Sequence, residues 1–306
     1  RGIVAEWSAA AGELTVWSAT QSPHEVRAVC ARVLGIPEHS VRVIARDTGG
    51  GFGQKVIPMR EDLAVVVAAT KVAVPIKWIE DRRENLMAAG MARREHGVAE
   101  MAFAADGSIL GARIDHLQDV GAYPSPWPVG TAAATGMLFP GPYRVPRATF
   151  TTTCVFTNSA GRTAYRGPWQ LESTAREMLL DRAARQMGMD PIELRRRNLL
   201  RADELPTVNP NGMSYDNMSP LETFEAAIER LDLEAFRRAQ AAARAEGRHL
   251  GVGTCTYAEP TTTGMGFYAT EGATIRVEPS GRVNVYVAGG SRSEEHTSEL
   301  QSPYVI

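Results

Sequence analysis

Residues 41–71 read VRVIARDTGGGFGQKVIPMREDLAVVVAATK, and this stretch organises the first part of the predicted fold. Val41–Ala45 is short, apolar and β-branched, which predicts a strand. Thr48–Lys55 is rich in glycine and predicts a loop. Arg60–Lys71 is apolar almost all round, which predicts a buried helix. A strand, a glycine-rich loop and a helix therefore follow one another here.

The residues on either side of this stretch predict three further elements. Glu13–Ser18 alternates between apolar and polar residues and predicts a half-buried strand. Ser22 and Pro23 are typical of a helix start, and the helix that they begin is expected to have one apolar face. That face consists of Val26, Val29, Val33 and Leu34. Pro75–Ile79 predicts a short strand.

The middle of the chain predicts a hairpin followed by a long irregular segment. Val98–Ala104 and Ile109–Leu117 alternate in polarity and are joined across Asp106-Gly107, a dipeptide that readily adopts positive φ. Gly121–Pro146 is rich in proline and glycine and nearly free of charge, which is typical of binding loops and lids. Two helices are expected after it, at Trp169–Gly188 and Pro191–Leu200.

The pattern breaks at Pro206–Asn217, where proline, asparagine and glycine predict a linker. We place a domain boundary there, with a first domain at 1–205 and the beginning of a second at 206–291. The second part is expected to contain two helices and three strands, at Leu221–Leu231, Leu233–Glu246, Gly251–Tyr257, Ala273–Glu278 and Arg282–Ala288. Separate hairpins and helices favour an α+β fold over a strictly alternating α/β sheet.

Composition excludes several classes of protein. The 306 residues are 44% hydrophobic and 22% charged, which is typical of a globular chain and not of a disordered or collagen-like one. With 33 basic and 35 acidic residues the net charge is −2, so nucleic acid is not expected as the main partner. The apolar run Leu63–Thr70 is too short to span a membrane. Three cysteines without a C-x-x-C pair fit a reducing, cytoplasmic setting.

Both ends of the chain have unusual features. The first residue is Arg1 rather than methionine, so we expect that natural sequence before it is missing. Arg292–Ser302 reads RSEEHTSELQS, which is identified as the translation of a common short-read sequencing adapter. We therefore predict that 292–306 is a non-native tail, the alternative being a genuine polar tail.

The glycine-rich loop is the first candidate for a functional site. Bare backbone N–H groups between a strand and a helix can hold an anion, so a phosphate or a pterin-like ring would be a natural ligand of Gly49–Lys55. The loop is not a Walker A motif, because Val56 follows the lysine, and it lacks the G-x-G-x-x-G spacing. A purely structural glycine turn is the alternative interpretation.

Other polar residues carry weaker signals. Arg166, next to Gly167 in the segment Thr163–Gln170, could hold an oxyanion or a metal-oxo ligand, or could be an exposed arginine at a helix start. Gln21 is a neutral donor between a strand and a helix, which ordinarily indicates a solvated turn. The run Arg195–Arg197 is expected on a solvated or intersubunit face. No metal site is predicted from the histidines His24, His39, His96, His116 and His249, which lack helical pair spacing.

Five short motifs occur together in one order. They are Thr20-Gln21, the Gly49–Lys55 loop, Trp78–Arg82 with Glu84-Asn85, Asp119–Tyr123 and Ala164–Gly167. In this combination they resemble the molybdenum-binding large subunit of the xanthine dehydrogenase, aldehyde oxidase and carbon monoxide dehydrogenase family. The resemblance covers Arg1–Ser291 and implies an α+β chain with the first molybdopterin-binding domain and the beginning of the second.

The resemblance also implies site residues. Gln21 would hydrogen-bond an oxo ligand of the molybdenum, and the backbone of Gly50, Gly51, Phe52 and Gly53 would approach the metal and the pterin. Arg166 and Gly167 would line the opposite wall. The metal of this family is held by the pterin dithiolene, so Gln21, Phe52 and Arg166 would surround it without being its ligands.

The family's chemistry then gives expectations for the parent protein. Its members hydroxylate a carbon with oxygen derived from water, and their electrons pass through iron–sulfur clusters to FAD. We expect an iron–sulfur small subunit and an FAD-binding medium subunit as partners, and molybdopterin, in its cytosine dinucleotide form, as the cofactor. The family's catalytic glutamate follows the strand that ends at Gly290, so no catalytic residue is expected within this chain, which would be inactive alone.

Departures from the family pattern restrict the substrate. Purine-oxidising members carry a glutamate and an arginine at the places that hold Val56 and Ala134 here. Copper-dependent carbon monoxide enzymes carry a cysteine in the loop that holds Ala164–Trp169 here, so copper is not expected. Val56, Ala134, Pro168 and Trp169 would form an apolar substrate pocket for an aldehyde or an aromatic N-heterocycle.

Two alternatives from other classes remain. A non-catalytic cofactor-binding or partner-binding module would keep the glycine-rich loop but lack the late glutamate. A phosphate-binding enzyme would use Gly49–Lys55 and would show nucleotide affinity.

Overall fold

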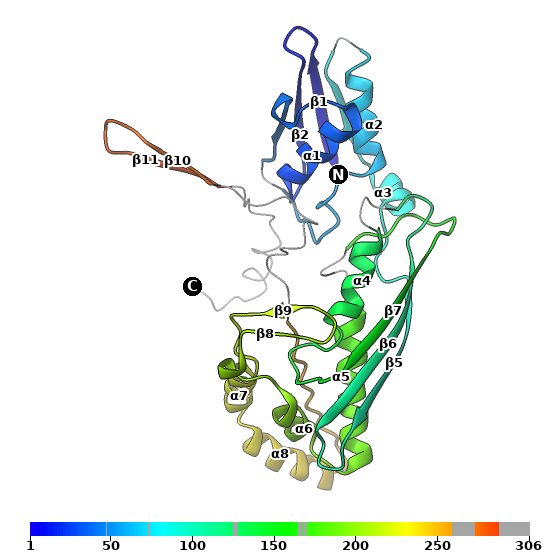
Figure 1. Cartoon of the computed structure of the whole chain (residues 1–306), viewed down its shortest axis with the longest axis vertical. Helices are drawn as coiled ribbons and strands as arrows, with labels where there is room; N and C mark the ends of the chain where they lie inside the picture. Colours follow the sequence, from blue (N-terminus) through cyan, green and yellow to red (C-terminus); the bar gives the residue numbers. More distant parts are fainter. Residues whose placement is uncertain are drawn as a thin grey trace.

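The computed structural model describes residues 1–46, 48–72, 74–124, 128–164, 167, 170–258 and 273–287. The chain forms two main lobes, stacked along the long axis of the molecule (Figure 1). Both lobes combine one sheet with helices on it, so the expected α+β class is confirmed. The expected tail, 292–306, lies outside the described residues.

The first lobe contains a four-stranded sheet in the order β3-β2-β1-β4. Strands β1 and β2 are antiparallel, β3 runs parallel to β2, and β4 is antiparallel to β1. The bounds of these elements, with the helices that connect them, are β1 Gly2–Ser8, β2 Glu13–Ser18, α1 Pro23–Leu34, the 3-10 turn η1 Glu38–Ser40, β3 Val41–Ile44, α2 Arg60–Ala69, β4 Ile76–Ile79 and α3 Arg82–Ala88. The predicted strand–loop–helix order is confirmed, whereas β1 and α3 were not expected.

Helices α1 and α2 pack on one face of this sheet. Leu14 and Val16 of β2 are fully buried against Val26 of α1 and Val66 of α2, which forms the core of the lobe. Val33, near the end of α1, is 46% exposed although Val26 and Val29 are buried. The expectation that α2 is buried almost all round was wrong, since Val67 is 37% exposed. An apolar composition did not bury α2 completely, because the side of the helix that faces away from the sheet and α1 is left exposed.

The second lobe is built around the sheet β5-β6-β7. Its antiparallel hairpin, β5 Glu95–Phe103 and β6 Ile109–Asp119, turns where Gly107 has φ 90°, as predicted from Asp106-Gly107. Strand β7, Ala148–Val155, runs parallel to β6 and was not expected.

Helix α4, Pro128–Leu138, corrects the expectation that Gly121–Pro146 is irregular throughout. Its small residues let the helix approach the sheet closely. A Cβ added at Gly136 would lie 2.7 Å from Cβ of Phe150 on β7, and nearer still to its ring. The small residues of this segment are thus compatible with a closely packed helix, and their abundance does not indicate a loop here.

Helices α5, Gln170–Met187, and α6, Pro191–Asn198, complete the core of the second lobe. Arg195 of α6 is 1% exposed, and its guanidinium contacts Glu177 at 2.9 Å and Asp181 at 2.7 Å. The expectation that Arg195–Arg197 lies on a solvated or intersubunit face is therefore wrong for Arg195. Its carboxylate partners lie on α5, and no local sequence pattern reveals them.

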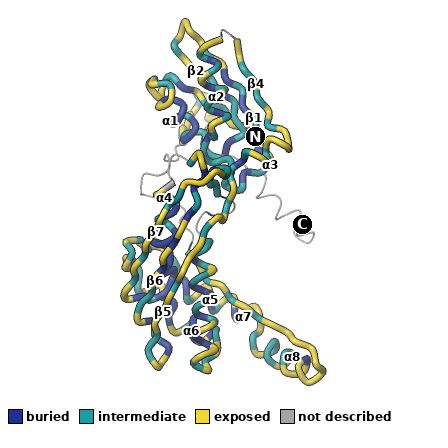
Figure 2. Tube along the Cα trace, turned by 90° about the vertical axis from the view of Figure 1, so that its right-hand side faces the viewer, coloured by how far each residue is buried: buried dark blue, intermediate teal, exposed yellow. Residues whose placement is uncertain are grey.

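The remaining elements begin just before the expected domain boundary, which stays a prediction. A short 3-10 turn, η2 Ala202–Glu204, precedes the region predicted as a linker. That region contains a two-stranded ladder of β8, Thr207–Val208, and β9, Ser214–Tyr215. Two helices follow it, α7 Pro220–Leu231 and α8 Leu233–Ala245. Figure 2 shows α8 as largely exposed. The strand expected at Gly251–Tyr257 does not form, and the backbone there is held instead by Arg176, which donates to the Thr256 carbonyl at 3.1 Å.

The last described element is the hairpin of β10, Ala273–Val277, and β11, Val283–Val287, as predicted. It projects away from both lobes (Figure 1). The pairs Ile275–Val285 and Val277–Val283 share one face, and all four side chains are between 55% and 68% exposed. This apolar face has no covering element in the described part of the chain.

Candidate functional site

Gln21 connects the end of β2 to the glycine-rich loop. Its side-chain Oε1 accepts hydrogen bonds from the backbone N–H groups of Gly53, at 2.9 Å, and Lys55, at 3.3 Å. Its own backbone N–H donates to the Lys55 carbonyl at 2.9 Å. The donor hydrogens of this side chain are on Nε2, and the two bonds to the loop amides do not use them.

The loop needs glycine for two physical reasons. Gly50 and Gly53 have φ 74° and 89°, a region that side chains disfavour, and Phe52 adopts the same left-handed region with φ 53°. A Cβ at Gly51 would lie 2.5 Å from Oε1 of Gln21 and closer still to its Cδ. Gly51 therefore allows Gln21 to lie directly against the loop backbone.

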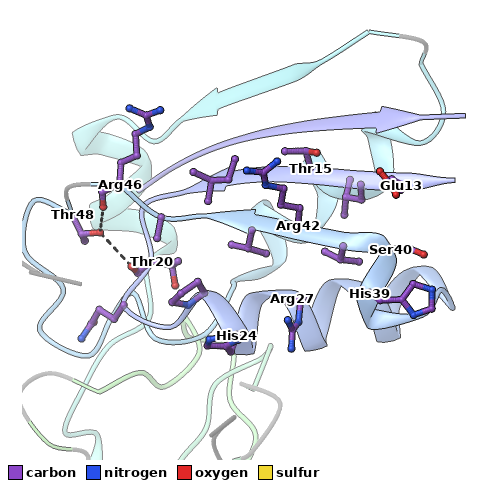
Figure 3. A pocket seen from close by; sticks show the side chains of 17 residues that line it. Glu13, Thr15, Thr20, His24, Arg27, His39, Ser40, Arg42, Arg46 and Thr48 are labelled. Atoms are coloured by element: carbon purple, nitrogen blue, oxygen red, sulfur yellow. Dashed lines mark hydrogen bonds between the residues drawn. The ribbon is translucent and has the colours of Figure 1, made fainter. Parts of the chain in front are cut away.

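Two threonines hold the ends of the loop. Thr20 donates from Oγ1 to the Lys55 carbonyl at 3.0 Å, and Thr48 donates to the Thr20 carbonyl at 3.3 Å. Figure 3 shows Thr48 between Thr20 and Arg46. The strand end, the loop and the start of α1 thus form one hydrogen-bonded unit.

A cavity of about 610 Å³ lies against this loop. Gly49, Gly50, Gly51 and Phe52 form one side of it. Its other described lining residues include the cationic side chains of Lys55, Arg82 and Arg93, with Arg1 beside them, and none of the described lining residues is acidic. The cavity is therefore suited to an anionic ligand.

A buried ion pair lies next to this cavity. The Arg1 guanidinium contacts Oε1 of Glu80 at 2.7 Å, and Asn85 donates to Oε2 of Glu80 at 2.9 Å. Burial alone would raise the pKa of Glu80, but the hydrogen bonds from Arg1 and Asn85 outweigh it and lower the pKa to about 2. Glu80 thus stays ionised and neutralises Arg1, and it fixes Asn85 at the cavity wall.

The second lobe reaches the same cavity through Ala164. A Cβ at Gly53 would lie 2.7 Å from Cβ of Ala164, so the loop and the segment before Arg166 are in close contact. Gly167 has φ 85°. Arg166, Pro168 and Trp169 lie outside the described residues. The contact between two of the five motifs is thus present, whereas the expected role of Arg166 stays a prediction.

Two of the four expected substrate-pocket residues, Val56 and Ala134, belong to the described part of the chain. Val56 follows the loop and is half-buried, and Ala134 is half-buried in α4. Neither side chain lines the cavity of about 610 Å³. Their shared pocket with Pro168 and Trp169 stays a prediction.

Asp119, the first residue of the motif Asp119–Tyr123, has a positioning function that the sequence did not predict. Its carboxylate accepts from the Gly121 backbone at 2.8 Å, from Thr157 at 2.8 Å and from Ser159 at 3.2 Å. Partial desolvation opposes ionisation, yet these hydrogen bonds lower the pKa of Asp119. Asp119 therefore holds the backbone that leads to Ala164.

Two further observations concern the described residues. No group of three or more histidine, cysteine, aspartate or glutamate side chains is placed there to hold a metal ion. Among the same residues, no helix is both long and apolar enough to cross a membrane.

A glycine loop held by a glutamine, beside a cationic cavity, is an arrangement expected of a protein that binds an anionic cofactor. A family model described as molybdopterin cofactor-binding domain matches residues 1–199, and a second model with this description matches residues 226–294. The chain therefore belongs to the molybdopterin-binding large subunits of the xanthine dehydrogenase and carbon monoxide dehydrogenase family, as its motifs indicate.

Individual relatives support this assignment. The chain is 35% identical to the nicotine 6-hydroxylase large subunit of Paenarthrobacter nicotinovorans, over 98% of this chain and 38% of that protein. It is 33% identical to the carbon monoxide dehydrogenase large chain of Hydrogenophaga pseudoflava, over 92% of this chain and 37% of that one. The structure of quinoline 2-oxidoreductase from Pseudomonas putida 86 aligns with a TM-score of 0.84 and 37% identity, and the alignment covers 97% of this chain and 39% of that one. The chain thus spans about two fifths of these relatives.

Proposed function

We propose that this chain forms one side of the cofactor site in a molybdenum hydroxylase, and that its parent oxidises an aldehyde or an aromatic N-heterocycle. The observation that carries the proposal is the Gln21–loop unit beside the cationic cavity. Molybdopterin has a phosphate and a ring edged with hydrogen-bonding groups, so bare loop amides and positive side chains fit it. When bound, the cofactor would supply the oxidation–reduction chemistry.

The chain's own residues would bind and orient this cofactor. Gln21, with Oε1 held by the loop, presents Nε2 as a donor, and the backbone of Gly50, Gly51, Phe52 and Gly53 allows close approach. Lys55, Arg82 and Arg93 would attract its negative charge. Arg166 and Gly167 would form the opposite wall, next to Ala164.

An aromatic N-heterocycle is the favoured substrate class. Val56, Ala134, Pro168 and Trp169 offer no charged anchor for a purine. Two of the relatives described above are named for oxidising quinoline and nicotine, both N-heterocyclic compounds. No cysteine occurs in 164–169, which disfavours a copper-dependent carbon monoxide activity.

The parent would act in the cytoplasm with an iron–sulfur small subunit and an FAD-binding medium subunit. The relatives' designations as a large subunit and a large chain support a complex of this kind. The first domain would comprise 1–205 and the second would begin at 206–291, with the catalytic glutamate supplied by sequence after 291.

The test is the cofactor content of the full-length parent, matured together with its partner subunits. We expect molybdenum by elemental analysis, CMP released by acid hydrolysis of the cytosine dinucleotide, and faster turnover of quinoline than of an aliphatic aldehyde. A known molybdenum hydroxylase matured in the same host controls for poor cofactor supply. Background molybdenum in the parent, with a fully loaded control, would contradict the proposal.

A further inference from the structure

A second cavity, of about 770 Å³, lies at the free edge of the first sheet. It follows β3 from Val41 to Ala45, and α1 contributes His24 and Arg27 to its lining. Figure 3 shows Arg27 on the α1 side of the strand, with Arg42 and Thr15 on the strands themselves. Because this groove runs along a strand, it has room for an extended chain.

Strand β3 offers hydrogen-bonding groups to such a chain. It is the outermost strand of its sheet and pairs only with β2 among the described strands. An outermost strand leaves every second N–H and C=O pointing away from the sheet, and an extended peptide can add there as a further strand. The side chain of Val41 is buried in the core of the lobe, which fixes the position of the strand.

Positive charge is distributed along the groove. Arg27, Arg42 and Arg46 line it, together with two histidines, whereas Glu13 is the one acidic residue among the described lining residues. Arg27 contacts Glu38 at 3.3 Å through Nη2, but its buried Nε has no hydrogen-bond partner. Arg42 and Arg46 form no ion pair within the described part of the chain. These cations are spaced along the strand and do not converge on one point, which suits a polymer better than a small anion.

The groove also ends at the candidate cofactor site. Thr20, Gln21 and Thr48 line it, and the same residues hold the glycine-rich loop. An occupant of the groove would therefore lie next to the loop that binds the cofactor.

We propose that the groove between β3 and α1 is the docking site for an extended, acidic segment of a partner subunit, which pairs with the open edge of β3. This inference rests on the proposed function, since it requires a parent that works with partner subunits. A partner docked here would contact the Gln21 turn and lie close to the cofactor from which it receives electrons.

Photo-crosslinking in the full-length parent, co-expressed with its partner subunits, identifies the occupant. We expect Arg42→p-benzoylphenylalanine to cross-link a partner subunit within a segment rich in aspartate and glutamate, as read by mass spectrometry. The matched control is Arg238→p-benzoylphenylalanine on exposed α8. A cross-link within the large subunit, a cross-link between two large subunits, or none above the control would each overturn the proposal.

Charge reversal measures the energetic contribution of the groove. We expect Arg42→Glu with Arg46→Glu to weaken association with the partner at least tenfold at low salt, and less at high salt. Both side chains are exposed, so the fold should be retained, and Arg238→Glu should change the affinity less than twofold. An equal effect of the two charge reversals would overturn the proposal. Molybdenum content measured in the same preparations separates this failure from failure of the proposed function.

Discussion

Replacing Gly51 by alanine should detach Gln21 from the loop. The new Cβ would overlap the Gln21 side chain, with Oε1 at 2.5 Å, so Gln21 has to move away. It would then lose the hydrogen bonds from Gly53 and Lys55. Each bond contributes about 1 kcal/mol net, and amides left unsatisfied by their surroundings add to the cost, giving a total of about 2–4 kcal/mol.

Hydrogen exchange in the full-length parent, produced with its partner subunits, measures this loss directly. Exchange of the Gly53 and Lys55 amides should accelerate by roughly 30-fold to 700-fold, since about 1.4 kcal/mol corresponds to a factor of ten. Gly49→Ala is the matched control, because a Cβ there would meet no atom within 4 Å. In the matured parent, Gly51→Val should empty the cofactor site, while replacing Lys55 should lower its occupancy less.

A double-mutant cycle tests the physical cause. Gln21→Ala removes the same two hydrogen bonds and also removes the atoms that a Cβ at Gly51 would meet. In the Gln21→Ala background, Gly51→Ala should therefore have little further effect. Additive effects of the two substitutions would refute the reasoning, because they would show that Gly51 acts on something other than Gln21.

Three further predictions concern the rest of the chain. Arg195→Ala removes a buried partner of Glu177 and should lower the free energy of unfolding by about 3–5 kcal/mol. Arg196→Ala, at a partly exposed ion pair, should lower it by only about 0–1 kcal/mol. Similar urea midpoints for the two variants would contradict this prediction. The pKa of Asp119 is lowered from its usual 3.8, so the ionised carboxylate stabilises the fold above that pH. The excess Tm of the natural chain over Asp119→Asn should therefore shrink as the pH falls from about 6 to about 3, and a constant difference would contradict this. The 306-residue chain alone should fold poorly and self-associate through the apolar face of the β10–β11 hairpin. Val285→Lys, on that face, should therefore reduce its apparent mass in size exclusion. Thr274→Lys, on the other face of the hairpin, should leave the apparent mass unchanged.

The elements that sequence predicts well have local causes. Asp106-Gly107 determines its hairpin because a positive φ is needed within the turn itself. Helix α4 was missed because its glycine and alanine residues serve contacts with β7, which is distant in sequence. Arg195 was misplaced for the same reason, since its partners belong to another helix. Composition reports local preference and cannot report which distant residue fills the space beside a side chain.

In the candidate site, too, sequence predicts the features with local causes and misses those that depend on contacts between distant residues. The glycine-rich sequence of Gly49–Lys55 is enough to predict a candidate anion-binding loop. Gln21, in contrast, reads as an ordinary turn residue, and only the family resemblance predicts a role for it at the cofactor. Its significance depends on Oε1 reaching amides more than 30 residues later in the chain. The positioning function of Asp119 likewise becomes visible only where its carboxylate meets Gly121 and Ser159.

Close contacts at glycine join the segments that surround the cavity. Gly51 admits Gln21, Gly53 lies against Ala164, and a Cβ at Gly90 would lie 2.8 Å from Cβ of Thr163. The contacts at Gly53 and Gly90 join the first lobe to the segment after β7 in the second lobe, and they leave no room for a side chain on the glycine. If the proposed cofactor binds here, the backbone amides that would hold it have positions that depend on how closely the two lobes approach. Substitutions at these glycines should therefore alter the cofactor site even where the glycine itself does not touch the cofactor.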